Sequence, residues 1–530
     1  MEFTPKIGLE IHVELKTNSK MFCSCRNDPD ETRPNFNVCP ICLGHPGTLP
    51  VINEEAVKKV IKTGLALNCE ISEYSFFERK SYFYPDLPKG YQISQYSTPL
   101  CKNGFLEIDG KKIRIRRIHL EEDTGRLIHE KDCSLVDFNR AGVPLMELVT
   151  EPDITSAKEA RKFAEELQLI LRYLNVSDAN MEKGQMRIEA NVSLICTNMD
   201  NSRIHTNLPS NMHEYNIREN SCSNSRKFEK NKIRENSRLL GTKVEIKNLN
   251  SFKAVERAII YEIKRQTEIL KSGGEVVQET RGWDPVKEIT FSQREKETEK
   301  DYRYFPEPDL PPLRITKEIL EEIKREMPEL PNEKRERLKN EYNLKEDKIE
   351  ILIRDIPLCN YFENSVSELK RWLRDELKKV DPETEFSAIE TLANYLISDL
   401  KGILKRENLE SKDLSSHITP ENFAEFVTLV FTKKISTRAG KDVLEEMFAK
   451  RTDPSQIIEE KGLYQKFNEE ELKKIVEEVI KENQKTVDDF KKGKEKAIQF
   501  LIGQVMRKTQ GKCEPKVVED LIREVLIKKE

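Results

Sequence analysis

The hydrophobic periodicity of the chain changes at one proline-rich segment. Before that segment, short stretches such as IGLEIHVEL (7–15) alternate apolar and polar residues, a pattern typical of β-strands with one buried face. After DYRYFPEPDLPPL (301–313), apolar residues recur at helical spacing, as in VSELKRWLRDELKKV (366–380). The sequence therefore predicts an α+β fold, in which a large part that contains strands precedes an all-helical part.

Three domains are predicted from this change and from a second, polar break in the helical part. Residues 1–295 form one large mixed α/β domain, because helical stretches at 155–174 and 250–272 interrupt the strands. Residues 296–405 form a helical domain, and residues 406–530 form a small all-α tail domain.

One segment of the first domain departs from its pattern. Residues 197–241 are rich in Asn, Ser, Arg and Lys and too poor in apolar residues to fold alone. This composition predicts a flexible insertion, and a functional arm is the alternative.

Charge and cysteine usage limit the class of protein. The 530 residues carry a net charge of −4, so any surface that binds nucleic acid must be locally basic. Eleven cysteines, scattered singly after the first four, argue against a disulfide framework and favour a reducing compartment. We find no signal-peptide pattern and no apolar run of the roughly eighteen residues that a membrane span needs. We expect a cytoplasmic protein with no membrane partner.

Four cysteines lie close together in FCSCRNDPDETRPNFNVCPIC (22–42). Their C-x-C and C-x-x-C spacing allows four thiolates to close on one tetrahedral metal ion, and Zn²⁺ is the expected metal. A site made of cysteines alone leaves no coordination position open, which indicates a structural role. Unligated cysteines are the alternative. The predicted ligands are Cys23, Cys25, Cys39 and Cys42.

Acidic residues and a histidine form a second candidate site. Glu10 and His12 project from one face of the first predicted strand. They make a plausible cation site if another acidic element lies near, although a solvated edge strand gives the same pattern. Glu121 ends a later strand, and Glu147 lies in an apolar run where a lone carboxylate is costly. A salt bridge with Arg140 or a similar cation is the alternative explanation for Glu147.

The segment RKSYFYPDLPKGYQISQ (79–95) concentrates tyrosines, prolines and lysines, among them Lys80, Tyr82 and Lys89. Such a loop can line a pocket or stack on a base, and a rigid turn packed on the core is the alternative. The chain contains no P-loop motif and no dinucleotide-binding glycine pattern. Any use of ATP must therefore depend on a metal site of another kind.

Basic residues gather locally in the helical part. Lys433 and Lys434 lie in FTKKISTRAGK, and a second group lies in VMRKTQGKCEPK near the C-terminus, namely Arg507, Lys508 and Lys512. Such clusters suit contacts with a phosphate backbone, and solvated helix faces are the alternative.

Several longer motifs occur in the order of a known family. They are IGLEIHVEL, VCPICLGHPGTLPVIN, SYFYPDLPKGYQISQY, HLEEDTGR, DFNRAGVPLMELVTEPD, VEIKNLNSFKAVERAI and DYRYFPEPDLPPL, followed near the C-terminus by GKEKAIQFLIGQVMRKTQGK. Over essentially its whole length the chain resembles the B subunits of aspartyl/glutamyl-tRNA amidotransferases (GatB). The resemblance implies a cradle-shaped catalytic domain, a helical domain and a helical tail that contacts tRNA.

The resemblance also implies a reaction and its partners. Such subunits use ATP and Mg²⁺ to phosphorylate the side-chain carboxylate of Glu or Asp misacylated on tRNA-Gln or tRNA-Asn. An amidase (A) subunit supplies ammonia from glutamine, and a small C subunit wraps the other two. Which misacylated tRNA is used stays open. There are two competing interpretations. One is a stand-alone ATP-dependent ligase, and the other is a zinc-bearing tRNA-binding or assembly factor without kinase activity.

Residue by residue, Glu10, His12, Glu121 and Glu147 match the Mg²⁺ ligands of this family. The resemblance further assigns Lys80, Tyr82 and Lys89 to the nucleotide and acyl end. The chain departs from the family at Arg187-Ile188-Glu189, where Arg-Cys-Asp is usual. This departure touches none of the four expected ligands.

Overall fold

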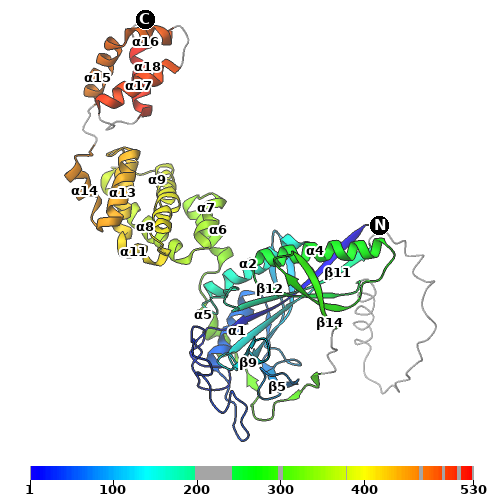
Figure 1. Cartoon of the computed structure of the whole chain (residues 1–530). Helices are drawn as coiled ribbons and strands as arrows, with labels where there is room; N and C mark the ends of the chain where they lie inside the picture. Colours follow the sequence, from blue (N-terminus) through cyan, green and yellow to red (C-terminus); the bar gives the residue numbers. More distant parts are fainter. Residues whose placement is uncertain are drawn as a thin grey trace. The chain divides into compact units, whose positions relative to one another are not determined.

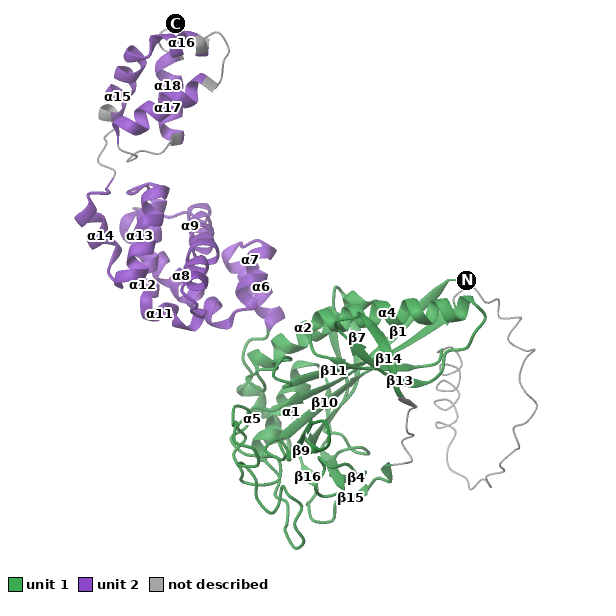
Figure 2. Ribbon diagram, in the orientation of Figure 1, with its two compact units in different colours: residues 1–330 green, residues 331–530 purple. Residues whose placement is uncertain are grey.

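The computed structural model of the chain describes residues 2–196, 241–295, 302–377, 379–464, 469–491, 496–509 and 515–527 (Figure 1). Its described residues form two compact units, Met1–Leu330 and Pro331–Glu530 (Figure 2). Strands and helices make up the first unit and helices the second, which confirms the predicted α+β class. The predicted insertion lies outside the described residues except for Gly241.

A nine-stranded sheet forms the centre of the first unit, in the order β14-β13-β12-β11-β1-β10-β7-β6-β2. Neighbouring strands are antiparallel except for β12 and β13. The strands are β1 (Phe3–Glu14), β2 (Glu70–Ile71), β6 (Cys101–Ile108), β7 (Lys111–Glu122), β10 (Pro144–Thr150), β11 (Met186–Cys196), β12 (Val244–Leu249), β13 (Glu279–Asp284) and β14 (Ile289–Glu295). Because β1 lies between β11 and β10, the strand that carries Glu10 and His12 is central, and the edge-strand alternative is wrong.

Three helices pack on one face of this sheet, namely α1 (Glu54–Ala66), α2 (Ala157–Tyr173) and α4 (Phe252–Lys271). Figure 1 shows α2 and α4 along the same side of the sheet. The apolar half of β1 faces them, so that Leu9, Ile11 and Val13 are fully buried. The alternating polar residues of β1 therefore point to the other face. That second face carries the candidate site.

The helices predicted from sequence begin and end close to the expected residues. The Ser156 side chain accepts a hydrogen bond from the backbone N–H of Glu159 and caps α2, and Ser251 caps α4 in the same way. Helix α4 ends just before Gly273, whose φ of +81° suits a residue without a Cβ.

Short strands extend the first unit beyond the prolines. A three-stranded sheet joins β4 (Glu78–Ser81), β5 (Tyr91–Ser94) and β15 (Phe305–Pro306). The strand β16 (Leu313–Arg314) pairs with β3 (Tyr74–Ser75), and Leu310, Ile315 and Ile323 are buried in the main core. The compact unit thus ends at Leu330 and not near the expected 295, because the proline-rich segment returns to the sheet. Helix α5 (Lys317–Arg325) and the hairpin of β8 (Arg126–His129) and β9 (Ser134–Asp137) complete this unit.

The second unit is helical throughout its described residues. Its first helices are α6 (Pro331–Tyr342), α7 (Glu346–Ile353), α8 (Ile356–Glu376), α9 (Pro382–Asn394), the π-helical turn η3 (Tyr395–Leu400), α10 (Lys401–Arg406), η4 (Ser411–Asp413), α11 (Leu414–His417), α12 (Pro420–Phe431), α13 (Thr437–Lys450) and α14 (Pro454–Lys461). Helix α12 packs on α8, with the rings of Tyr361 and Phe423 5.8 Å apart, so helices on both sides of the expected 405/406 boundary share one core.

Four further helices pack around a core of their own that includes Val476, Leu501 and Ile522. They are α15 (Glu469–Glu482), α16 (Gln484–Lys491), α17 (Lys496–Lys508) and α18 (Pro515–Ile527). Among the described residues, no helix is both long and apolar enough to cross a membrane.

Candidate active site and metal centre

A row of ionisable side chains crosses the polar face of the large sheet. In the strand register, Glu147 of β10 lies opposite His119 of β7 on one side and His12 of β1 on the other. His12 in turn lies opposite Arg187 of β11. Directly opposed residues point to the same face of a sheet, so four neighbouring strands direct one residue each to this row.

The side chains of this row meet at two buried carboxylates, Glu121 and Glu147, whose residues are 2% and 6% exposed. The Nε2 atom of His12 lies 3.5 Å from an oxygen of Glu121 and 3.4 Å from one of Glu147. The Nε2 atom of His119 lies 3.5 Å from the same Glu147 oxygen and 3.8 Å from Glu121. Glu10 joins them, because its carboxylate lies within 4.8 Å of the ligand atoms of His12 and Glu147. The four predicted Mg²⁺ ligands thus form two overlapping groups, Glu10 with His12 and Glu147, and Glu121 with His119 and Glu147.

The electrostatics of this cluster favour a cation. Burial disfavours a charged His12, but the hydrogen bond and charge of Glu147 outweigh it and raise the pKa of His12 to about 9. Burial would also raise the pKa of Glu147, yet His119 and His12 hold it well below its usual value. Burial, followed by the charges of Glu147 and Glu189, raises the pKa of Glu10 to about 7. Like-charged carboxylates held this close need a positive charge between them.

The donor set of the cluster fits Mg²⁺. Carboxylate oxygens are the ligands that this ion prefers, and Glu10, Glu121 and Glu147 supply them from three different strands. Glu147 does not pair with Arg140, which lies 3.6 Å from Asp123. It does lie 3.5 Å from Arg117, so the alternative of a salt bridge with a similar cation is met by Arg117.

Lys80 and four tyrosines lie beside the cluster. The tyrosines, here called the aromatic wall, are Tyr82, Tyr96, Tyr302 and Tyr304. Burial disfavours the charge of Lys80, yet Glu121, together with Glu147, raises the pKa of this lysine above its usual value. Its Nζ lies 4.9 Å from the ring centre of Tyr302, which makes an edge contact with Tyr82 at 6.1 Å. Lys80 and Tyr82 therefore lie near the carboxylates, as the prediction requires.

Sequence reasoning missed most of this aromatic wall. Tyr302 contacts Tyr304 at 6.2 Å, and Tyr304 stacks on Tyr96 with ring centres 4.4 Å apart. Arg117 lies over Tyr96 and so joins the wall to the carboxylates. The signal was present in DYRYF, but its neighbouring prolines indicated only a break between domains.

An ion pair holds the segment that carries Tyr302 and Tyr304 against β4. Arg79 donates two hydrogen bonds to the buried carboxylate of Glu307, at 2.6 and 2.8 Å, and a third to Asp309. Next to this ion pair, strand β15 pairs with β4, so that Phe305 lies opposite Arg79. Arg79 and Lys80 are successive residues of a strand and point to opposite faces, so Arg79 holds the segment while Lys80 faces the site. We call Arg79 and Glu307 the strand clamp.

Lys89 does not lie with Lys80 and Tyr82. It forms an ion pair with Glu122, whose side chain lies apart from that of Glu121. Both residues line a cavity of about 240 Å³ together with Cys42 and His45. The structure therefore places Lys89 beside the cysteine cluster.

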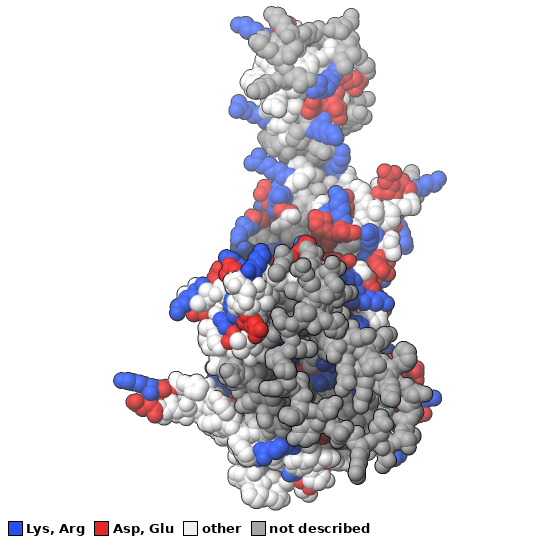
Figure 3. Space-filling model, turned by 90° about the vertical axis from the view of Figure 1, so that its right-hand side faces the viewer, with Lys and Arg blue, Asp and Glu red and all other residues white. Residues whose placement is uncertain are grey.

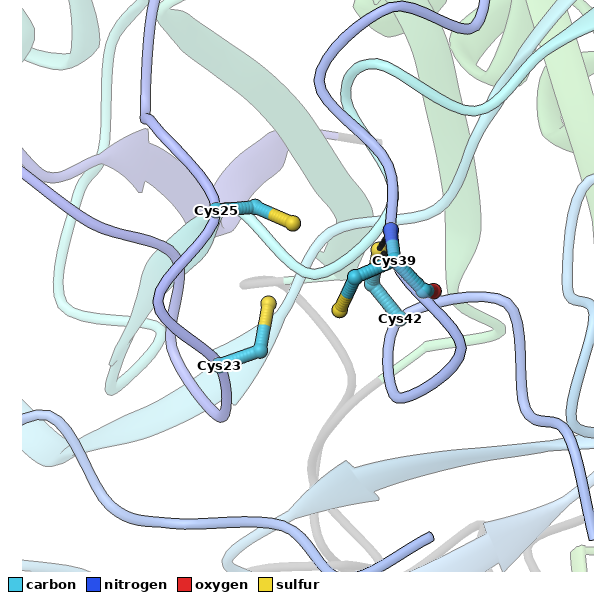
Figure 4. Close-up of side chains that lie close together, drawn as sticks. All are labelled: Cys23, Cys25, Cys39 and Cys42. Carbon is cyan, nitrogen blue, oxygen red and sulfur yellow. Dashed lines mark hydrogen bonds between the residues drawn. The ribbon is translucent and has the colours of Figure 1, made fainter.

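The four predicted zinc ligands do converge. Cys23 and Cys25 come from the turn after β1, and Cys39 and Cys42 come from a second turn; their side chains point toward a common centre (Figure 4). All four sulfur atoms lie within 4.8 Å of one another. A hydrogen bond from Cys23 lowers the pKa of Cys42 to about 5, which favours a thiolate. The cluster fits a closed tetrahedral Zn²⁺ site.

The predicted tRNA-binding residues lie in the helical unit. Lys434 pairs with Glu376 at 2.7 Å, and Lys508 pairs with Glu482 at 2.8 Å. Arg507 lies in the last turn of α17, Lys433 directly follows α12 and its capping residue, and Lys512 lies outside the described residues. On the face drawn in Figure 3, Lys and Arg side chains lie among Asp and Glu side chains. Lys434 and Lys508 therefore belong to mixed charge networks.

Comparison with known proteins places the chain in a family. It matches the GatB/GatE catalytic domain over residues 5–229 and 210–321, and the GatB domain over residues 383–526. It is 46% identical over 530 residues to the B subunit of the aspartyl/glutamyl-tRNA(Asn/Gln) amidotransferase of Persephonella marina, covering 99% of this chain and 100% of the relative. The corresponding subunits of Thermotoga maritima and Caldanaerobacter subterraneus are 45% and 44% identical, and the matches cover at least 99% of each chain. The chain therefore belongs to the B-subunit family of the aspartyl/glutamyl-tRNA amidotransferases.

Proposed function

We propose that this chain catalyses the ATP-dependent activation step of a tRNA-dependent amidotransferase. In this step the side-chain carboxylate of Glu or Asp, attached to tRNA-Gln or tRNA-Asn, attacks the γ-phosphorus of ATP, and ADP leaves. Ammonia from the glutaminase reaction of a partner amidase subunit then displaces phosphate and leaves Gln-tRNA or Asn-tRNA. The observation that carries the proposal is the convergence of Glu10, His12, Glu121 and Glu147 beneath Lys80.

The reaction explains why so much charge is buried here. A carboxylate and a triphosphate repel each other, and bound Mg²⁺ supplies the positive charge that offsets this repulsion. Glu10, Glu121 and Glu147, from three strands, would hold the ion together with His12, which contacts both Glu121 and Glu147. Lys80 adds a fixed cation on the opposite side, and the tyrosines beside it restrict access of water.

Partners and location follow from the same proposal. We propose an amidase (A) subunit and a small C subunit as partners, which form a heterotrimer with this chain, and a cytoplasmic location among the other components of translation. Helices α15–α18 and the basic residues around Lys434 and Lys508 are proposed to contact tRNA. Zn²⁺ at the cysteine cluster is proposed as a structural ion.

The competing functions explain less. A tRNA-binding or assembly factor would use the zinc site but would gain nothing from a costly buried cluster of carboxylates and imidazoles. A stand-alone ligase would need its own source of ammonia, whereas the relatives are named as subunits.

The proposal is tested with the complex reconstituted from this chain and its A and C partners. We expect ATP hydrolysis that depends on misacylated tRNA, and amidation of Glu-tRNA-Gln or Asp-tRNA-Asn with glutamine or ammonium chloride. Assaying both tRNAs identifies the substrate. If neither misacylated tRNA stimulates ADP formation, the proposed activation step is wrong.

The strand clamp gives a separate prediction. Replacing Glu307 by glutamine removes the charge that holds Arg79, and we expect kcat for amidation to fall about tenfold or more with a smaller change in KM for ATP. The reason is that Tyr302 and Tyr304 lose their fixed position beside Lys80. Steady-state kinetics with ammonium chloride as nitrogen donor measures the effect.

The control breaks a more exposed ion pair elsewhere in the same unit. Asp153 accepts two hydrogen bonds from Arg114, at 2.8 and 2.7 Å, and Asp153→Asn is expected to leave kcat unchanged. Both variants are assayed at a temperature at which thermal unfolding shows them folded. A Glu307→Gln variant with normal kcat and a lowered melting temperature would mean that the clamp serves stability alone.

A further inference from the structure

A lysine is completely buried next to the cysteine cluster. Lys20 is 0% exposed and ranks among the largest fully buried side chains of the described residues. Lysine is almost never buried in this way without a partner of opposite charge. Within the part of the chain that the structure describes, its Nζ makes hydrogen bonds to the Sγ of Cys42 at 3.8 Å and to the backbone carbonyl of Phe138 at 3.3 Å, and it has no carboxylate within ion-pair distance.

The backbone fixes Lys20 in this place. Its N–H donates to the carbonyl of Cys25, and the next N–H, of Met21, donates to the carbonyl of Gly142 at 2.7 Å. Gly142 has a φ of +83°, and a Cβ there would lie 3.4 Å from the Cβ of Cys42 and 3.6 Å from the Cδ of Lys20. The lysine, the glycine and the cysteine are therefore packed closely, so the ammonium group cannot readily move to solvent.

The charge of a loaded metal site explains this burial. Four thiolates around Zn²⁺ carry a net charge of −2, which is costly inside a protein unless a cation lies near. Lys20 supplies one positive charge directly beside a ligand sulfur. Without metal, most of the thiols are protonated, so the negative charge beside Lys20 is smaller than in the loaded cluster.

We propose that Lys20 is the buried counter-cation of the metal-loaded cysteine cluster and a positioning residue that sets its affinity for Zn²⁺. The inference rests on the proposed zinc site and is independent of the proposed reaction. The charges of the neighbouring Lys89 and Glu122 cancel each other in an ion pair. Lys20 is therefore left to balance the negative charge of the metal-loaded cluster.

The first test measures Zn²⁺ affinity of the full-length, reduced chain by competition with a chromophoric chelator. We expect Lys20→Met, which keeps the length but not the charge, to bind Zn²⁺ about 10–100-fold more weakly, the usual effect of losing a group that supports metal ligands. Lys20→Arg keeps the charge and is expected to bind much more tightly than Lys20→Met. The control is Lys16→Met, since Lys16 is 54% exposed and pairs with Asp178 on the surface.

The second test separates charge balance from packing. Lys20→Met is expected to lower the melting temperature of the Zn²⁺-loaded chain by more than that of the metal-free, reduced chain, because the loaded cluster places the larger negative charge beside Lys20. An equal loss in both states, or wild-type Zn²⁺ affinity of Lys20→Met, would overturn the role of Lys20. If the wild-type chain itself binds no Zn²⁺, the zinc site and the inference fail together, whereas the proposed reaction stands.

Discussion

Replacing Glu147 by alanine is expected to abolish tRNA-dependent ATP hydrolysis, with a fall of about a thousandfold or more. Glu147 is the central group of the cluster, since it contacts His12, His119 and Arg117. Its loss removes a proposed Mg²⁺ ligand and leaves two imidazoles without their shared carboxylate. Losses of this size are typical when a charge-stabilising group is removed from a phosphoryl-transfer site.

His12→Ala is expected to have a similar effect, because His12 contacts both Glu121 and Glu147. ADP formation in the presence of misacylated tRNA measures the activation step, and amidation with ammonium chloride measures the complete reaction without the glutaminase. A variant that retains more than about a tenth of wild-type ADP formation would show that its residue does not serve phosphoryl transfer.

The matched control is Glu151→Ala. Glu151 directly follows the strand that carries Glu147, but its carboxylate pairs with Arg116, whose side chain is 57% exposed. Exposed pairs of this kind contribute little to stability. We expect this variant to keep wild-type activity, so that a loss confined to Glu147 and His12 reports on the site itself.

The period-two pattern predicted which face of β1 would carry Glu10 and His12, but it did not predict their neighbours. Alternation fixes the direction of a side chain within one strand, whereas strand order depends on contacts between distant segments. The pairing of Glu147 with both His12 and His119 follows from β10 lying between β1 and β7. From sequence alone, the four ligands could be combined only through the family resemblance.

The same limit explains the separation of Lys89 from Lys80. Eight residues lie between them in the chain, and nothing local indicates that the turn directs Lys89 to Glu122 and the cysteine cluster. The prolines of 301–313 predict a break between domains, because proline disrupts regular structure. These prolines are instead compatible with two-residue strands. Strand β15 returns to β4, and the residues just before it, Tyr302 and Tyr304, reach the site.

Removal of the proposed zinc ion is expected to have the largest effect on stability. The segment between β1 and α1 buries few large apolar side chains, chiefly Leu15, Met21 and Phe22, so bonds to the proposed metal would replace a local core. Cys39→Ser removes one of four ligands, and we expect loss of bound Zn²⁺ and a decrease of about 4 kcal/mol or more in the free energy of unfolding. Metal analysis and denaturant unfolding of the full-length chain measure both.

The effect should extend from the cluster into the active site. The segment is tied to α1 through the side chain of Asn53, which donates hydrogen bonds to the backbone carbonyls of Ser19 and Lys20, and it continues directly from the strand of His12. Cys133→Ser is the control, because Cys133 is exposed and lies in a different hairpin. A Cys39→Ser chain that unfolds like wild type without bound zinc would refute a structural metal. We expect instead that stability falls first and activity second, since the cysteines hold the segment while the carboxylates and His12 perform the chemistry.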